Sequence, residues 1–213
     1  FEDVPLGEDI SARLGITEYF PPIPVELAGD VYPLPSVPNF GHFDVEQPRV
    51  FAEELVEGEQ VFITEKLHGT QLSATLTSDG VFFITSKGLA KRGVALKESD
   101  SNAYWRAARD ANLRVRMEDI LSKTGASVVQ VFGEVVRVQK GFHYGFEKPT
   151  LRVYETRLDG VPTSIGHEPV IDCLQDIYVP LVWNGPYSAE KATELAKGNE
   201  TLTGKGLHIK EGV

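Results

Sequence analysis

The most constraining feature of the chain is a β-hairpin pattern near its middle. Residues 71–77 alternate between apolar and polar side chains, the turn sequence Ser78-Asp79-Gly80 follows, and residues 81–85 provide a second apolar strand. Alternation with a period of two, broken by a glycine-containing turn, predicts two antiparallel strands. The chain is therefore expected to fold around an antiparallel sheet.

The remaining pattern mixes strands and helices without a strict alternation of the two. Further strands are expected at residues 61–63, 127–138 with an interruption at Gly133-Glu134, 150–156 and 207–210. Helices are expected at residues 101–123, with a break near Asn112 and an end at Gly125, and at residues 188–197. This order favours an α+β fold, with mostly antiparallel sheets flanked by helices, over a doubly wound fold.

The first fifty residues differ from the rest because prolines are concentrated in them. Proline fixes φ and lacks an amide donor, which excludes long helices and central strands here. We expect residues 1–50 to form an extended arm that packs on a body of residues 51–213, with one helical turn near residues 9–14. A flexible linker is the alternative. The prolines in question are Pro21, Pro22, Pro24, Pro33, Pro35 and Pro38.

Composition excludes several classes of protein. The single cysteine, Cys173, rules out a disulfide framework and a zinc site built from several cysteines. No uncharged apolar run approaches the roughly 18 residues of a membrane span, and no signal peptide is visible, so the expected compartment is the cytoplasm. The net charge of −10 argues against a general nucleic-acid coat protein, but permits an enzyme with a local basic groove.

The sharpest local motif is Lys66-Leu67-His68-Gly69. A lysine that follows an apolar strand and precedes a glycine turn projects from a rigid element, as a nucleophilic amine requires. The motif alone is weak evidence, because Lys-x-x-Gly occurs about once by chance in a chain of this length. A surface lysine beside a turn is the alternative explanation.

Four further motifs follow this lysine in order along the chain. Two place a carboxylate on or at the end of an apolar strand, which is costly unless the charge is paired or near a metal ion. Taken singly, the carboxylates could be edge-strand charges and the tyrosine could be core. All five motifs in one order are much less expected by accident. The four are Ser86-Lys87-Gly88, Phe132-Gly133-Glu134, Val153-Tyr154-Glu155 and Glu211-Gly212-Val213.

With these motifs the chain resembles the covalent nucleotidyltransferases, which comprise ATP-dependent polynucleotide ligases and their capping-enzyme relatives. The string at residues 64–70 and the tract at residues 138–145 are typical of RNA ligases. The early prolines resemble the nick-sealing branch, whose extra OB module would precede Phe1. One departure is that the Lys-x-Lys motif expected after the Glu-Gly motif is absent, so the domain at residues 51–213 lacks its last motif.

The resemblance implies a three-step reaction. Lys66 would attack the α-phosphorus of ATP to give a lysyl-AMP intermediate. AMP would pass to a 5′-phosphate, and a 3′-OH would then displace it. His68 would serve the later steps, and Lys87 would contact the ribose or a phosphate. Hard carboxylates suit Mg²⁺ or Mn²⁺, and Glu134 and Glu211 would hold this metal ion, largely through its waters.

The resemblance also implies the nucleotide contacts. Tyr154 would stack on adenine, and the backbone around Glu65 and Leu67 would contact the base edge. Glu134 would also reach the ribose, and Arg49 is expected to reach a phosphate. The expected partners are RNA or RNA/DNA ends, in a nicked duplex, bound by a monomer with no membrane association.

Two alternatives remain open from the sequence. A DNA ligase or a GTP-using capping enzyme is possible, although His68 and the tract at residues 139–145 weigh against both. A nucleotide-binding or RNA-end-binding module without full catalysis is the other, favoured slightly by the missing Lys-x-Lys motif and the acidic charge. A plain α+β domain with coincidental motifs is the least favoured interpretation.

Overall fold

The structure is a computed structural model that describes residues 10–16, 29–38, 40–41, 50–163 and 165–213. A seven-stranded sheet forms the larger part, with strand order β1-β5-β4-β3-β6-β7-β8 and antiparallel pairing between neighbours. This confirms the predicted α+β fold with mostly antiparallel sheets. The strands are β1 (Val31–Pro33), β3 (Thr70–Thr77), β4 (Phe82–Thr85), β5 (Val94–Leu96), β6 (Val128–Val136), β7 (Thr150–Leu158) and β8 (Val161–Pro162).

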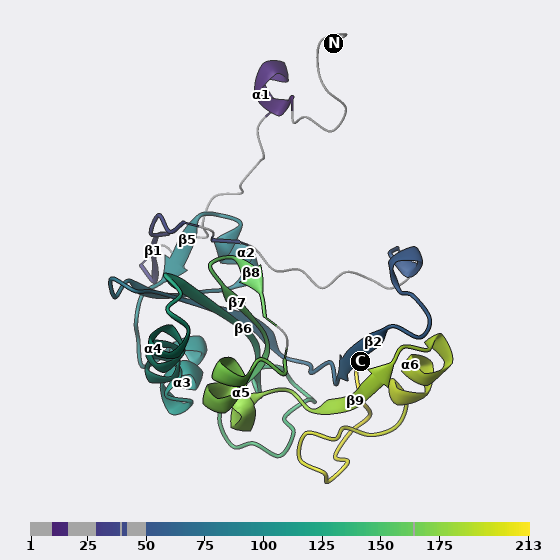
Figure 1. Cartoon of the computed structure of the whole chain (residues 1–213). Helices are drawn as coiled ribbons and strands as arrows, with labels where there is room; N and C mark the ends of the chain where they lie inside the picture. The colour runs from purple at the N-terminus through teal and green to yellow at the C-terminus, as the bar shows by residue number, and fades with distance from the viewer. Residues whose placement is uncertain (1–9, 17–28, 39, 42–49, 164) are drawn as a thin grey trace.

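Three helices cover one face of this sheet (Figure 1). They are α3 (Ala103–Asp110), α4 (Leu113–Thr124) and α5 (Glu168–Leu174). The expected break falls at Asn112, which adopts the left-handed conformation with φ 50°, and α4 ends at Gly125 with φ 71°. The shorter helices are α1 (Ser11–Leu14), α2 (Lys87–Ala90), α6 (Ala189–Leu195) and the 3₁₀ turns at Ala52–Glu54 and Gln175–Ile177.

The core lies between the large sheet and these helices. Leu72, Ala74 and Leu76, which alternate along β3, are fully buried there with Met117 and Ile120 of α4. This is the apolar face that the hairpin pattern predicted. Burial of such side chains stabilises the sheet by about 1.5–3 kcal/mol each.

Strand β6 corrects one expectation. It runs unbroken through Gly133-Glu134, where an interruption was expected, and the irregularity is a bulge between Phe132 and Gly133 in the pairing with β7. A side chain at Gly133 would come within 2.7 Å of the carbonyl oxygen of Arg152. The glycine therefore permits close contact with β7 and does not end the strand.

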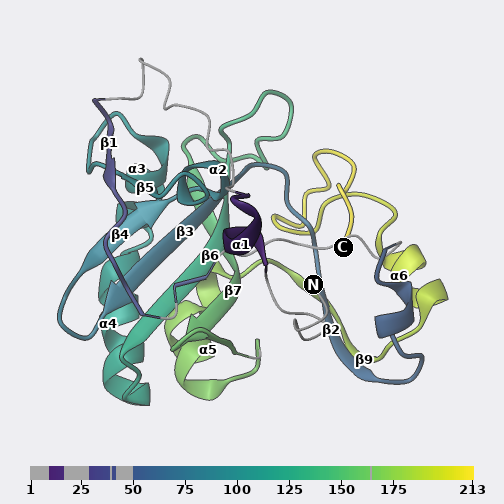
Figure 2. The ribbon, with the colours of Figure 1, turned by 90° about the horizontal axis from the view of Figure 1, so that it is seen from above.

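A second, two-stranded sheet lies beside the large one (Figure 2). Strands β2 (Gln60–Thr64) and β9 (Leu181–Pro186) pair antiparallel in it. Neither β9 nor helix α5 was predicted, because β9 contains Gly185-Pro186 and α5 is only seven residues long. Both segments are too short for periodicity to distinguish them from loops.

The expected strand at residues 207–210 is wrong. The chain after α6 forms an irregular loop, with isolated bridges between Asn199 and Ile209 and between Lys66 and Gly212. Gly204 and Gly206 have positive φ values and turn the chain back on itself. The buried carboxylate of Glu200 holds this turn by accepting hydrogen bonds from the amides of Thr203 and Leu207.

The predicted N-terminal arm is described only in part. Val31–Pro33 forms an edge strand of the large sheet, where Pro33 is compatible with its missing donor. Arg49 lies outside the described residues. Packing of the whole arm on the body stays a prediction.

Candidate active site

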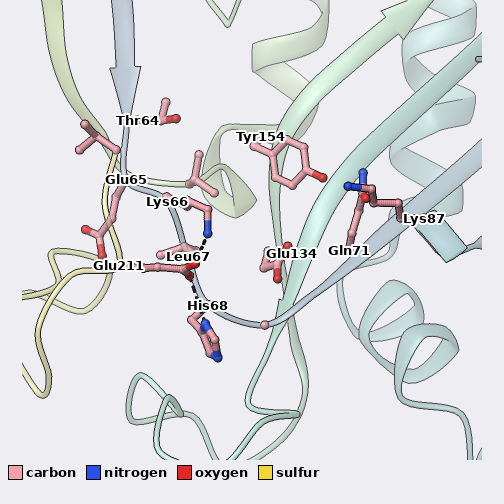
Figure 3. Close-up of a pocket in the computed structure, with 13 residues that line it drawn as sticks. Thr64, Glu65, Lys66, Leu67, His68, Gln71, Lys87, Glu134, Tyr154 and Glu211 are labelled. Carbon is pink, nitrogen blue, oxygen red and sulfur yellow. Dashed lines mark hydrogen bonds and ion pairs between the residues drawn. The ribbon is translucent and has the colours of Figure 1, made fainter. Parts of the chain in front are cut away.

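A cavity of ≈ 530 Å³ lies where the two sheets meet. Every predicted site residue that the structure describes contributes to its wall. Figure 3 shows Lys66 and Glu211 on one side of it and Glu134 and Tyr154 on the other. The lining residues are Thr64, Glu65, Lys66, Leu67, His68, Gly69, Gln71, Lys87, Glu134, Tyr154, Val179, Glu211 and Val213.

Lys66 stands just beyond the end of β2. Its backbone N–H donates to the carbonyl of Gly212 at 3.0 Å, which fastens residues 211–213 to Lys66-Leu67-His68-Gly69, the expected nucleophile motif. Its amine forms an ion pair with the carboxylate of Glu211, and half of the side chain, 51%, is exposed to the cavity and solvent. The ion pair requires the protonated amine, whereas nucleophilic attack requires the unprotonated one. A lysine paired in this way would have to leave its carboxylate before it could act as a nucleophile.

Glu211 contacts two residues of the motif at once. Besides Lys66, it approaches His68, whose Nδ1 lies 3.2 Å from Glu211 Oε2. The backbone N–H of His68 donates to the hydroxyl of Tyr144 at 2.8 Å, and its ring packs against Phe142 with centroids 4.3 Å apart. His68 is therefore fixed by backbone, ring and side-chain contacts next to the amine.

Glu65 is buried directly before the lysine, with 1% of its surface exposed. Its Oε2 accepts a hydrogen bond from the backbone N–H of Thr201 at 2.8 Å and another from the Thr201 hydroxyl. Its Oε1 is buried without a partner among the described residues. Glu65 thus ties the end of β2 to the loop that leads to Glu211.

Gly69 allows the turn after the motif to lie against β6. A Cβ atom there would overlap the carbonyl of Val135 and come within 3.0 Å of Glu134 Cγ. The side-chain amide of Gln139 also donates to the Gly69 carbonyl. Only glycine permits this approach, so the motif's last residue sets the position of Lys66 relative to Glu134.

Glu134 faces the amine from β6 on the opposite wall (Figure 3). Burial raises the pKa of its carboxyl to about 7, and the negative charge of Glu211 also raises it, while Lys66 and a hydrogen bond from the Gly69 backbone act in the other direction. A carboxyl whose pKa lies near neutrality, in a cavity with a lysine, is typical of a functional site.

Tyr154 and Lys87 complete the same wall from β7 and the first residue of α2. Tyr154 is half-buried and packs against the small apolar cluster that contains Leu67 and Val179. Gln71 on β3 also lines the cavity, next to Lys87 (Figure 3). The wall therefore offers an aromatic ring, a cation and an amide to a bound molecule.

The carboxylates of the cavity fit an open site for a divalent cation. In the part of the chain that the structure describes, no group of three or more His, Cys, Asp or Glu side chains is arranged to hold a metal ion. Two carboxylates, Glu134 and Glu211, face the cavity, and the negative charge of Glu211 contributes to the raised pKa of Glu134. Mg²⁺ is commonly held by one or two carboxylates together with waters and substrate phosphates. The residues fit that kind of site and do not form a closed protein cage.

Sequence reasoning missed several residues that shape the site. Gln71 lines the cavity, and Phe142, Tyr144 and Thr201 hold His68 and Glu65 in place. The tract at residues 138–145 was noted as a motif, but no role was assigned to its aromatic residues. The alternation along β3 could have indicated Gln71, because this polar residue lies on the face of the strand opposite Leu72 and Ala74.

The chain matches known proteins in sequence and in fold. The family model described as RNA ligase matches residues 59–213. A search of curated proteins found no significant match. Among helices of the described residues, none is long and apolar enough to cross a bilayer.

Solved structures of a Naegleria gruberi RNA ligase share the fold. The structure with PPi gives a TM-score of 0.66 at 21% identity, covering 97% of this chain and 60% of that one. A variant with ATP and Mn gives 0.68 at 20% identity, covering 97% and 61%. Another with AMP and Mn gives 0.66 at 20%, covering 98% and 61%. The chain thus spans about three fifths of the solved ligase chains it matches.

The antiparallel sheet, the lysine motif and the facing carboxylates define a protein of the nucleotidyltransferase type. The chain belongs to the RNA ligase family, because the family model covers most of its length. This confirms the resemblance drawn from the five motifs.

Proposed function

We propose that this chain forms the adenylate-transfer domain of an ATP-dependent RNA ligase. The observation that carries the proposal is the placement of Lys66 in a cavity between Glu211 and the facing pair of Glu134 and Tyr154. These residues come from four separate parts of the sequence. The cavity volume, ≈ 530 Å³, lies within the range of about 300–1,000 Å³ for small-ligand pockets, as an adenine nucleotide requires.

In the first step, the unprotonated amine of Lys66 forms a P–N bond to the α-phosphorus of ATP. The P–O bond to the β-phosphate breaks, and pyrophosphate leaves with the electron pair. The proton of the amine passes to solvent before the attack, which requires separation of the ion pair with Glu211.

Glu134 and Glu211 would hold a divalent cation, Mg²⁺ or Mn²⁺. Such an ion supplies positive charge that stabilises the negative charge on a reacting phosphate. The related Naegleria gruberi structures with ATP and Mn support this use of ATP and metal. Glu211 would then share its carboxylate between the cation and the amine of Lys66.

The other residues position the nucleotide. Tyr154 stacks on adenine, a contact worth about 1–3 kcal/mol per base. Lys87 contacts the ribose or a phosphate, and the backbone around Glu65 and Leu67 contacts the base edge. Arg49 stays a predicted phosphate ligand.

The later steps transfer AMP to RNA. A 5′-phosphate oxygen attacks the adenylate phosphorus, the P–N bond breaks, and the Lys66 amine takes up a proton again. A 3′-OH then attacks the activated 5′-phosphate, and AMP leaves. We assign His68 to these steps, because it lies beside Lys66 and shares Glu211 with it. A nicked duplex in RNA repair as substrate, an N-terminal OB module, a monomeric state and a cytoplasmic location stay predictions.

The test is self-adenylation of the full-length protein with each α-labelled nucleoside triphosphate and Mg²⁺. We expect label from ATP in the wild type and none in Lys66→Ala or in Lys66→Arg, whose guanidinium stays protonated. Lys123→Ala, which removes an equivalent lysine from helix α4, is the matched control and should label normally. Retained label in the Lys66 variants would remove Lys66 as the nucleophile.

Sealing assays separate the remaining alternatives. Preferential sealing of all-RNA over all-DNA nicks would support an RNA ligase over a DNA ligase. Labelling by GTP in place of ATP would indicate a capping-type enzyme. Nucleotide binding without any covalent adduct would indicate a binding module and contradict the proposal.

A further inference from the structure

Two loops beside the nucleophile motif contain basic residues and no acidic ones. Residues 135–146 and 201–210 lack Asp and Glu entirely, although the whole chain has 31 acidic and 21 basic residues. The basic side chains of these loops are Arg137, Lys140, His143, Lys205, His208 and Lys210. These two loops are therefore locally basic, although the whole chain is acidic.

The two loops lie side by side. The ring of His208 contacts both Tyr144 and Phe142, with centroid distances of 4.3 Å and 4.9 Å. A Cβ atom added at Gly145 would lie 3.0 Å from Leu207. Figures 1 and 2 show the loops following β6 and α6 next to each other in both views. The two loops are consequently packed against each other.

Three of these cations are available to a partner. Arg137, Lys140 and Lys205 are exposed, and they form no ion pair within the described ranges 10–16, 29–38, 40–41, 50–163 and 165–213. Lys123 and Lys148, by contrast, each pair with an aspartate. Cations without a neutralising carboxylate attract an external anion.

The first loop is held rigidly against the nucleophile motif. Tyr144 accepts a hydrogen bond from the His68 backbone, and Gln139 donates to the carbonyl of Gly69. Arg137 and Tyr144 have positive φ values of 70° and 49°, which residues with side chains rarely adopt. Such strained backbone is retained where surrounding contacts hold it, often at binding sites.

We propose that the loops at residues 137–146 and 201–210 form the docking surface for the RNA strand next to its reacting end. Arg137, Lys140 and Lys205 would neutralise successive phosphates of the strand. This inference rests on the proposed function and adds to it the part of the chain that holds RNA. An extended polyanion fits better than the triphosphate of ATP, because none of these three residues lines the nucleotide cavity.

The experiment measures binding of a 5′-phosphorylated oligoribonucleotide to the full-length protein by fluorescence anisotropy, without ATP, over a range of salt concentrations. Arg137→Ala/Lys140→Ala should weaken binding about tenfold near 0.1 M salt and reduce the log–log salt slope by about 1.4, the value for two lost contacts to a single strand. Adding Lys205→Ala should weaken binding further.

Arg114→Ala/Lys123→Ala is the matched control, since it removes the same charge from α4. Arg114 lies over the ring of Phe82, whose strand pairs at the end of β3 away from the nucleophile motif. This control should bind RNA like the wild type. Equal RNA binding by the loop variant and the wild type, or equal weakening by both double variants, would overturn the docking surface.

Self-adenylation in the same preparations keeps this inference separate from the proposed function. The loop variant should form the AMP adduct at the wild-type rate and with the wild-type KM for ATP. A raised KM for ATP with unchanged RNA binding would assign these cations to the triphosphate and overturn the proposal. An unlabelled wild type that still binds RNA through the loops would contradict the proposed function alone.

Discussion

The two walls of the cavity are built in different ways. Glu134 and Tyr154 lie on β6 and β7, two interior strands of the seven-stranded sheet, on which Val131, Val135 and Val153 are fully buried. Lys66 and Glu211 lie after a two-stranded sheet and in an irregular segment, joined by one isolated bridge and an ion pair. The first wall is fixed by packing and the second by a few polar contacts. We therefore expect the second wall to rearrange more easily than the first.

The largest expected effect tests the second wall. Glu211→Ala should lower the rate of self-adenylation by about a thousandfold if Glu211 holds the cation as proposed, since a bound metal ion contributes several kcal/mol of charge stabilisation. The thermal stability of this variant should hardly change, because a solvent-exposed ion pair contributes only about 0–1 kcal/mol to the free energy of unfolding. Single-turnover labelling and thermal melts measure the two quantities. A large loss of stability would show that this wall is as firmly packed as the first.

The converse effect is expected at the first wall. Leu72→Ala removes a fully buried side chain of β3 and should reduce the free energy of unfolding by about 3 kcal/mol. Adenylation per folded molecule should stay near normal. Leu181→Ala, at a half-exposed position of β9, is the matched control and should cost less than about 0.5 kcal/mol. Denaturant titrations compare them, and equal losses would remove the proposed contrast.

Glu134, in the first wall, should make the stability of the folded protein depend on pH. Its folded pKa of about 7 lies above the ordinary value of 4.5, so the folded state keeps a proton that the unfolded chain has lost between these pH values. Its stabilising contribution of about 3 kcal/mol is fully present below pH 4.5 and is lost as pH rises through 7. Glu134→Gln should make the free energy of unfolding less dependent on pH. Glu118→Gln, on the exposed side of α4, should leave that dependence unchanged.

The effect of Mg²⁺ on the melting temperature tests the role of Glu134 in a second way. Mg²⁺ should raise the melting temperature of the wild type at pH 8 and have a smaller effect on Glu134→Gln, because the cation compensates the buried charge. An equal shift in both proteins would exclude Glu134 as a ligand.

The smallest effect concerns the link between β2 and the C-terminal loop. Thr201→Val removes the hydroxyl that donates to Glu65 and should lower the melting temperature by about 2–4 °C, corresponding to roughly 1 kcal/mol. Thr201→Ser should restore it. Thr193→Val, on exposed α6, is the control for the change of residue type. A Thr201→Val protein as stable as the wild type would show that this bond does not hold the second wall.

The two walls also differ in how well they could be predicted from the sequence. Alternation in residues 71–77 and the signals at Asn112 and Gly125 predicted the sheet and the helix boundaries, because local periodicity reports on burial. In the second wall, the apolar pattern predicted strand β2, but the site residues could be predicted only from motifs. Its strand β9 is short, and its segment after residue 206 was wrongly expected to be a strand.

The contacts that fix the site lay beyond local patterns. Tyr144 meets His68 across 76 residues of sequence, and Thr201 meets Glu65 across 136. No periodicity links residues so far apart, since their approach depends on how loops pack. The motif order nevertheless selected the cavity residues, because the chemistry requires a lysine, carboxylates and an aromatic ring together.

The central claim is that Lys66 becomes covalently bonded to adenylate before any strand is joined. The most direct measurement is mass spectrometry of the intact protein and its peptides after incubation with ATP and Mg²⁺ and without RNA. The account predicts one added adenylate, located on the peptide that contains Lys66 and removed by adding pyrophosphate. An adduct on another lysine such as Lys87, or an unmodified protein that still joins RNA ends, would contradict it.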